Sequence, residues 1–252
     1  MTGVQTCALP ILHQNLVGYL SIRSIRKADM IVVQNEWMRK ACAEKARVDA
    51  SKIRVLSQTS ESLPRIGRFV LSESSRSVFF YPATAKSYKN HELFLEAALI
   101  LNNNCKYKFS VVMTLVGDET KKIRKIRDQA KSKGLGFEFR RTMSRSAVFD
   151  MYTKSILVFP SLLETVGLPL VEAKAAGTII LAYDAEYSRD VLTGYSDAYF
   201  FKDAEGLAGL MRECLDGSLK YYRGIDRTIP VGESWASIIQ DFVTMTIERD
   251  NK

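Results

Sequence analysis

Two carboxylates lie on either side of a glycine in the stretch FPSLLETVGLPLVEAKAAG, residues 159–177. Glu164 follows an apolar run, and Glu172 comes after seven intervening residues. A carboxylate accepts hydrogen bonds from neighbouring hydroxyls, such as those of a ribose or another sugar. Both acids are therefore candidates for holding a hydroxyl-rich ligand. Two plainer roles stay open: Glu164 as a solvated loop residue, and Glu172 as an acid that stabilises a helix through its dipole.

The residues around the second acid predict a helix with an open N-terminus. Gly167 allows a close approach of the backbone, and Pro169 suits the first helical position, where an N–H is not needed. Gly177 stands where such a helix would end. We therefore expect a helix over 168–176, with Glu172 in its first turn. The unpaired amides and the dipole of a helix start bind anions, and a diphosphate is the natural ligand.

The rest of the chain alternates between apolar runs and segments with helical periodicity, which indicates an α/β fold. Strands are expected at 28–35, 52–57, 77–83, 108–117, 137–143, 155–161, 178–184 and 198–201, and helices at 12–28, 36–46, 90–101, 121–134, 144–152, 168–176, 186–192, 203–215 and 234–248. This alternation implies a parallel sheet, whose ligands bind at the carboxyl ends of the strands. The functional edge is therefore expected to consist of loops 82–89, 117–120, 140–144, 160–168 and 184–186.

The order of these elements predicts one complete Rossmann-like domain over residues 77–216 and part of a second over residues 12–57. A domain of this type needs on the order of 150 residues. The first range nearly supplies them, whereas the second supplies only the last third. Residues 58–76 are rich in serine and predict a linker or an exposed loop.

The first eleven residues, MTGVQTCALPI, carry no charge and are too short for a membrane span, so they predict neither a signal peptide nor a membrane anchor. When they are back-translated, every codon through Ile11 matches a common sequencing-library adapter. We therefore interpret residues 1–11 as a non-native scar and expect the natural protein to extend further at its N-terminus. A native strand or loop is the alternative.

The composition is that of an ordinary globular protein, with 46% hydrophobic and 25% charged residues. No apolar run reaches the length of about 18 residues that a membrane-spanning helix needs. Of the four cysteines, Cys7 belongs to the suspected scar. The other three, Cys42, Cys105 and Cys214, lack the spacing of a metal site, and an odd number does not suit a disulfide framework. A reducing, cytoplasmic setting is therefore expected. His91 stands at a predicted helix start, where we expect it to cap the helix or to lie at the surface.

The net charge of +8 allows an anionic partner: nucleic acid, a lipid surface or a phosphorylated small molecule. The densest basic run, residues 121–134, places Ile123, Ile126 and Ala130 on one helical face. The basic residues then form the solvated face of an outer helix. Because no RNA- or DNA-binding motif accompanies them, nucleic acid is not expected as a partner.

The pattern Glu164-x7-Glu172, with Gly167-Leu168-Pro169 inside it, resembles the EX7E signature of the retaining GT-B glycosyltransferases of family 4, also called group 1. The similarity extends over residues 28–245. The segment ADMIVVQNEWMRK resembles the end of the family's N-terminal acceptor domain, and FFYPATAKSYKNHELFLEAA resembles the start of its C-terminal donor domain. The segment 217–252 contains an amphipathic stretch that resembles the C-terminal helix that packs back on the N-terminal part.

The resemblance implies a role for each matching position. Lys89 would neutralise the diphosphate of the donor, Glu164 would hold the hydroxyls of the donor sugar, and Glu172 would bind the ribose. The backbone of Thr165, Val166, Gly167 and Leu168 would line the sugar and phosphate, and Thr142 and Met143 would lie by the nucleobase. The chain departs from the family at Ala83-Thr84, where Gly-Arg is usual, and at Thr142, where glycine is usual.

The reaction implied is transfer of a sugar from a nucleotide sugar to an acceptor hydroxyl with retention, in polysaccharide or glycoconjugate synthesis. Its transition state would be oxocarbenium-like, with Lys89 and the helix start stabilising the leaving diphosphate. The sequence contains no Asp-x-Asp motif, so neither a bound metal nor another cofactor is expected. The acceptor is open, and a lipid-linked one would place the enzyme at the inner face of the membrane. Because the acceptor part is incomplete, the chain as given is expected to be weakly active or inactive. The alternatives are a non-catalytic nucleotide-sugar-binding protein and another GT-B enzyme, such as a nucleotide-sugar epimerase.

Overall fold

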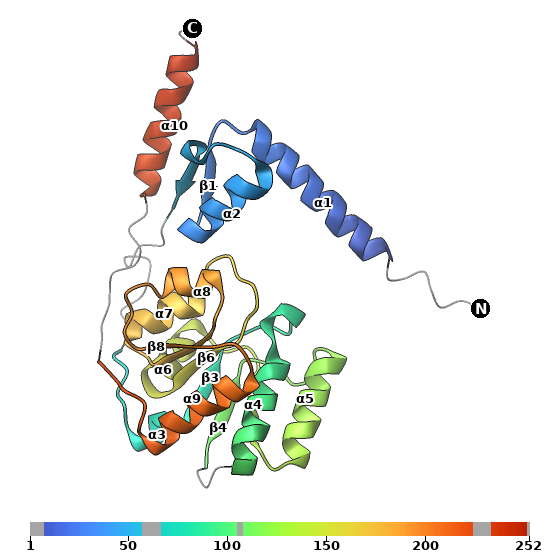
Figure 1. Cartoon of the computed structure of the whole chain (residues 1–252), viewed down its shortest axis with the longest axis vertical. Helices are drawn as coiled ribbons and strands as arrows, with labels where there is room; N and C mark the ends of the chain where they lie inside the picture. The colour runs from blue at the N-terminus through green and yellow to red at the C-terminus, as the bar shows by residue number, and fades with distance from the viewer. Residues whose placement is uncertain (1–7, 57–66, 105–107, 224–232, 251–252) are drawn as a thin grey trace, which may run out of the picture. The chain divides into compact units, whose positions relative to one another are not determined.

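The computed structural model describes residues 8–56, 67–104, 108–223 and 233–250. The chain divides into two compact units (Figure 1). The larger unit is Thr59–Ile229, and the smaller unit combines Met1–Gln58 with Pro230–Lys252. No helix among the described residues is both long and apolar enough to cross a bilayer.

The larger unit is built on a six-stranded parallel sheet with the strand order β5-β4-β3-β6-β7-β8. Its strands are β3 (Val78–Tyr81), β4 (Ser110–Met113), β5 (Gly136–Phe139), β6 (Ile156–Phe159), β7 (Ile180–Tyr183) and β8 (Ala198–Phe201). In the centre, Phe79 of β3 stands opposite Val111 of β4 on one side and Ile156 of β6 on the other. The predicted α/β fold with a parallel sheet is therefore confirmed.

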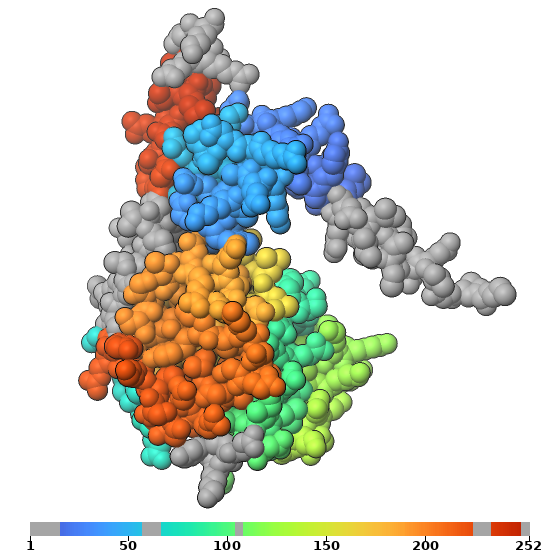
Figure 2. Space-filling view, viewed as in Figure 1, coloured from blue at the N-terminus to red at the C-terminus, as the bar shows by residue number. Residues whose placement is uncertain are grey.

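Helices connect these strands, and their arrangement marks the edge at which a ligand binds. They are α4 (His91–Asn104), α5 (Lys121–Ser132), α6 (Arg145–Lys154), α7 (Leu168–Ala176), α8 (Glu186–Val191) and α9 (Ala204–Asp216). Helix α4 packs against α5 and α9, which lie together on the surface drawn in Figure 2, whereas α6 packs against α7. From β3 the chain continues to β4 on one side of the sheet, whereas from β6 it continues to β7 on the other side. The order in which strands are added therefore reverses between β3 and β6. Such a reversal opens a crevice at the carboxyl ends of the two strands.

The core of the larger unit lies along these two central strands. All four residues of β6 are fully buried, as are Phe79, Phe80 and Tyr81 of β3. A run buried on both faces is what a parallel sheet covered by helices requires. Tyr81 also contacts Phe94 of α4 and Phe159 of β6 edge to face, which anchors the end of β3 beside the crevice.

The smaller unit contains α1 (Ala8–Lys27), β1 (Ile31–Val33), α2 (Glu36–Ala46), β2 (Ile53–Val55) and α10 (Trp235–Asp250). The two strands pair in parallel, and Val33, Ile53 and Val55 form the small core. The segment before α10 joins this unit, because the Glu233 amide donates to the Val55 carbonyl at 2.9 Å. Arg54 of β2 also forms an ion pair with Asp241 of α10 at 2.9 Å.

The predicted linker over 58–76 differs from the structure in its second half, residues 67–76; residues 57–66 lie outside the described residues. Phe69 is buried, donates its amide to the Ala176 carbonyl at 2.8 Å and contacts the Tyr221 ring edge to face. A short helix, α3 (Glu73–Arg76), follows with a capping box formed by Ser72 and Ser75. The serines therefore cap a helix of the larger unit and do not form a linker.

Two other boundaries differ from the sequence expectations. Residues 217–223, expected in the C-terminal segment, belong to the larger unit, where the Tyr222 amide donates to Asp197 Oδ1 at 2.7 Å. At the other end, α1 begins at Ala8, so residues 8–11 of the suspected scar are helical and residues 1–7 lie outside the described residues.

Candidate functional site

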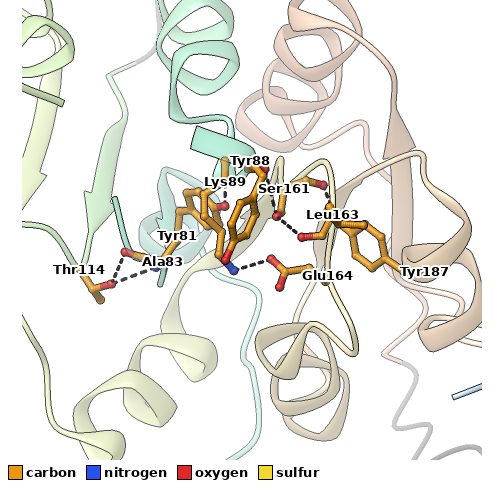
Figure 3. A network of polar contacts seen from close by, with 9 residues as sticks. All are labelled: Tyr81, Ala83, Tyr88, Lys89, Thr114, Ser161, Leu163, Glu164 and Tyr187. Carbon is orange, nitrogen blue, oxygen red and sulfur yellow. Dashed lines mark hydrogen bonds and ion pairs between the residues drawn. The ribbon is translucent and has the colours of Figure 1, made fainter. Parts of the chain in front are cut away.

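The crevice between the ends of β3 and β6 brings together residues that are far apart in the sequence. Lys89 ends a turn of 3-10 helix, η3 (Ser87–Lys89), in the loop after β3. Glu164 lies in the loop after β6. Figure 3 shows the Lys89 ammonium and the Glu164 carboxylate pointing toward each other, and they form an ion pair and hydrogen bond.

This ion pair is mostly shielded from solvent, because each of the two side chains is only 13% exposed. The Lys89 ammonium also lies 5.5 Å from the centre of the Tyr88 ring and 5.8 Å from that of the Phe159 ring. Aromatic faces attract a cation at such distances. Shielding and aromatic neighbours strengthen every charge interaction here relative to water.

Hydrogen bonds fix the two loops to each other and to the sheet. The Tyr81 hydroxyl donates to the Lys89 carbonyl at 2.8 Å, and the Leu162 amide donates to the Tyr88 carbonyl at 2.8 Å. Burial raises the pKa of Tyr81 well above its usual value, so its hydroxyl stays protonated and remains a donor. The loops are therefore held in place before any ligand arrives.

The loop after β6 is also held from α8. Ser161 is fully buried, and its carbonyl accepts a hydrogen bond from the Tyr187 hydroxyl at 2.5 Å. Burial raises the pKa of Tyr187, with the Glu164 carboxylate adding to the effect. Figure 3 shows Tyr187 and Ser161 on the same side of the site as Glu164.

Helix α7 begins directly after this loop and ends as predicted, at residues 168–176. Gly167 adopts a left-handed conformation with φ 71°, and a Cβ there would lie 3.2 Å from Leu170 Cδ1. No side chain caps the helix, and Pro169 occupies its first turn. Pro169 has no N–H and the Leu170 amide donates to the Gly167 carbonyl at 2.8 Å, so the amides of Gly167 and Leu168 are the ones left for an anion.

Glu172 does not lie in the first turn of α7, where the sequence analysis places it. The helix has the predicted bounds, 168–176, but Glu172 is its fifth residue and belongs to the second turn. The helix dipole acts mainly within the first turn, which weakens the dipole explanation for this acid. The Tyr152 hydroxyl of α6 donates to Glu172 Oε2 at 3.0 Å, and Arg145 Nη2 lies 3.7 Å from Oε1.

The environment of Glu172 favours an accepting oxygen in a shielded place. The side chain is 12% exposed. Burial raises the pKa of Glu172, and the Tyr152 hydrogen bond and the Arg145 charge counteract that rise. Because Tyr152 already donates to Oε2, we expect a ligand hydroxyl to donate to Oε1.

The residues expected beside a nucleobase lie in the loop between β5 and α6. The predicted strand over 137–143 ends early, at Phe139, because Arg141 turns the chain with φ 56°. Thr142 is exposed and lies three residues before Arg145, and Met143 is partly buried and lies two residues before it. This loop therefore leads directly into the residue that faces Glu172.

The remaining predicted positions form the stretch between the two acids. Val166 and Gly167 are buried, whereas Thr165 and Leu168 are exposed. Five further residues that hold the site together are not predicted from the sequence: Tyr81, Arg145, Tyr152, Ser161 and Tyr187. The buried tyrosines carry no distinct signal in the sequence, because an aromatic residue in an apolar run is typical of the core.

Comparisons with known proteins identify the family and the fold of the chain. A family model described as Glycosyl transferases group 1 matches residues 66–227, well over half of the chain. The search of curated proteins found no match.

Among solved structures, the chain is similar to sucrose-phosphate synthase from Thermosynechococcus elongatus (TM-score 0.66, 15% identity, 92% of this chain and 61% of that chain). It is also similar to Alr3699/HepE of Anabaena in complex with UDP and glucose (TM-score 0.65, 14% identity, 79% and 57%) and to a glycosyltransferase of Rickettsia africae (TM-score 0.66, 14% identity, 87% and 63%).

At such low identity these likenesses show a shared fold, that of the GT-B glycosyltransferases. The chain spans less than two thirds of the length of these structures. The family model covers β3 to α9 and thus contains both loops of the crevice, the open start of α7 and both acids. The chain therefore belongs to the group 1 glycosyl transferases.

Proposed function

We propose that the larger unit binds a nucleotide sugar in the crevice between β3 and β6, and that the protein transfers this sugar to an acceptor hydroxyl with retention of the anomeric configuration. The observation that carries the proposal is the shielded Lys89–Glu164 pair beside the uncapped start of α7. A cation and an open helix N-terminus suit a diphosphate, and a neighbouring carboxylate suits sugar hydroxyls.

Lys89 would stabilise the leaving diphosphate. An ammonium has three N–H donors, so it can keep Glu164 as a partner and still donate to a phosphate oxygen. The backbone at Gly167 and Leu168 would add the amides and the dipole of α7. As the bond between the anomeric carbon and the diphosphate breaks, negative charge grows on the phosphate, where these groups are already in place.

The two acids would divide the sugars of the donor between them. Glu164 would accept hydrogen bonds from the transferred sugar, because its carboxylate lies next to the diphosphate-binding lysine. Glu172 would accept a ribose hydroxyl through Oε1, while Tyr152 holds Oε2. Thr142 and Met143 would lie beside the base, because their loop leads into Arg145 and thus toward Glu172.

The setting follows from charge and from the family resemblance. We propose a cytoplasmic role in polysaccharide or glycoconjugate synthesis, with a lipid-linked acceptor and with the net charge of +8 drawing the protein to an anionic membrane. Flotation with liposomes rich in acidic lipid tests the membrane part. Absence of association at low salt would contradict it.

Turnover of donors tests the reaction itself. UDP-, GDP- and ADP-glucose are incubated with the full chain, with water as the acceptor, and released diphosphate and sugar are followed by proton NMR. Because the chain as given is expected to be weakly active at most, we expect one donor to release its diphosphate slowly, together with glucose that first appears in the donor's anomeric configuration. Glu164→Gln should abolish the release, whereas Glu96→Gln, at an exposed site on α4, should not.

The other outcomes point to the alternatives. A nucleotide sugar converted into an isomer, with its diphosphate retained, would indicate an epimerase. Donor binding without any turnover, even with added lipid acceptors, would favour a binding protein.

A further inference from the structure

A cavity with a volume of about 290 Å³ lies between the N-termini of α4 and α5. Its polar lining comes from the loop after β3 (Lys86, Ser87), from α4 (His91, Glu92) and from the start of α5 (Thr120, Lys121, Lys122). Neither Lys89 nor the two acids of the proposed donor site line it. The cavity is therefore separate from the proposed donor site, although it lies in the same unit.

The charges around the cavity favour an anion. Lys122 is paired with Glu92 across the two helices at 3.0 Å. In the part of the chain that the structure describes, Lys86 and Lys121 have no carboxylate partner. The nearby Glu119 is turned back onto its own loop, where its carboxylate accepts from the amides of Val116, Gly117 and Asp118.

Two helix starts add to this positive field. Helices α4 and α5 have 14 and 12 residues, and the amides of their first turns have no partner within the helix. Thr120 caps α5 by accepting from the Ile123 amide at 3.1 Å, which leaves the earlier amides of that helix open. A helix start of this kind attracts phosphate groups.

His91 supplies an independent sign of a missing ligand. We expected it to cap a helix or to lie at the surface, but it is only 4% exposed, and its ring lies 5.2 Å from the ring of Tyr81. Among the described residues, its Nε2 atom has no hydrogen-bond partner. Because a buried polar atom without a partner is unfavourable, an oxygen bound in the cavity would satisfy it.

Burial and the charge of Lys89 lower the pKa of His91 to about 4, so the ring is neutral near pH 7. A neutral imidazole can carry its hydrogen on Nε2 and donate it to an anion. The lining also has an apolar part, which comes from Ile123 and Ile126 of α5.

We propose that this cavity binds a small phosphomonoester, whose phosphate lies between Lys86, Lys121 and His91 Nε2 and whose organic part covers Ile123 and Ile126. The volume supports the second half of this proposal, because it exceeds what a phosphate ion alone would fill.

The chain offers a direct readout, because it contains only two histidines, His13 and His91. The imidazole nitrogens of the full chain are followed by NMR during titration with glycerol 3-phosphate, and sodium chloride at equal ionic strength serves as the control. Saturating UDP is present throughout, so that phosphate binding at the proposed donor site is suppressed. We expect the Nε2 resonance of His91 to shift with saturation while His13 stays unchanged.

Paired variants identify the cavity as the site. Lys121→Gln removes a lining charge, whereas Lys125→Gln removes an equally exposed lysine of the same helix that does not line the cavity. We expect Lys121→Gln to weaken binding about fivefold, equivalent to about 1 kcal/mol, and Lys125→Gln to leave it unchanged.

Three results would overturn the proposal: no shift of His91 beyond the chloride control, a shift without saturation, or equal weakening by both variants. None of them bears on the donor site, which is tested by UDP. If UDP fails to bind, the paired variants Lys121→Gln and Lys125→Gln still show whether the shift of His91 comes from the cavity.

Discussion

Removal of the Tyr152 hydroxyl should uncouple Glu172 from the fold without disturbing the core. Tyr152 is fully buried, and its ring contacts the rings of Phe80 and Phe149 edge to face, at 5.8 and 6.1 Å. Phenylalanine at this position keeps both contacts. Tyr152→Phe therefore removes mainly one interaction, the hydrogen bond to Glu172 Oε2 at 3.0 Å.

The size of the effect follows from the charge of the acceptor. A hydrogen bond to an ionised group contributes roughly 1.5–3 kcal/mol, and one between neutral groups about 0.5–1.5 kcal/mol. At about pH 7.5 Glu172 is ionised, so the variant should lose about 2 kcal/mol of unfolding free energy. At about pH 4, where the carboxyl is protonated, the loss should fall to about 1 kcal/mol.

The pKa of Glu172 gives this pH dependence the same sign. Burial already raises the folded-state pKa of Glu172, and loss of the Tyr152 bond raises it further. When folding raises the pKa of an acid, the free energy of unfolding falls as the pH rises from the unfolded-state pKa through the folded-state pKa. Below the unfolded-state pKa this loss of stability is absent. The difference between variant and wild type must therefore grow from acid to neutral pH.

Urea unfolding at both pH values measures this difference, and Tyr195→Phe is the matched control. Tyr195 is also buried, but its hydroxyl donates at 2.7 Å to the neutral carbonyl of Thr178, so its removal should be equally unfavourable at both pH values. The UDP dissociation constant of Tyr152→Phe should rise about tenfold, which corresponds to about 1.4 kcal/mol. An unchanged loss of stability at the two pH values, or unchanged UDP affinity, would refute the reasoning.

Three further predictions concern the crevice. Lys89→Gln and Glu164→Gln should each destabilise the fold, and the double variant should lose about 1–3 kcal/mol less than their sum; strict additivity in urea unfolding would show that the pair contributes nothing. Gly167→Ala should lower stability by about 1–2 kcal/mol, because its φ is 71° and a Cβ would contact Leu170 at 3.2 Å. Gly209→Ala, inside α9 with no atom within 4 Å of the added Cβ, should raise stability by up to about 1 kcal/mol. If calorimetry showed that Gly167→Ala and Gly209→Ala change the stability in the same direction, this account would be contradicted. Because Lys89 and the start of α7 are proposed to neutralise the diphosphate, EDTA should leave UDP-induced stabilisation unchanged, and its loss would reveal a metal requirement.

The local pattern of the sequence predicts helix α7 well, and three-dimensional partners explain what it misses. Gly167, Pro169 and Gly177 define the ends of α7 because each has a conformational reason to stand there. The ion pair of Lys89 with Glu164 could not be worked out from spacing, and the family resemblance gave each residue a ligand role but did not give the pair. Tyr152 could not be identified either, because its role depends on an acid that comes twenty positions later and on another helix.

Errors at the boundaries have similar causes. The strand predicted over 137–143 ends at Phe139, since the left-handed turn at Arg141 has no glycine or asparagine to announce it. The serine-rich stretch before β3 predicts a linker or an exposed loop, because the sequence does not show that Phe69 buries its ring against Tyr221.

Nucleotide-dependent stability of the full chain tests the central claim most directly, namely that the crevice between β3 and β6 holds the donor. Thermal unfolding is measured with UDP, GDP and ADP for the wild type, for Glu172→Ala and for the control Glu96→Ala on the exposed face of α4. At a concentration about 100 times its dissociation constant, the correct nucleotide should add roughly 2.7 kcal/mol. We expect one nucleotide to stabilise the wild type and Glu96→Ala, and Glu172→Ala to lose that response. A folded chain that responds to none of the three, or a response that Glu172→Ala retains in full, would contradict the assignment of the donor site.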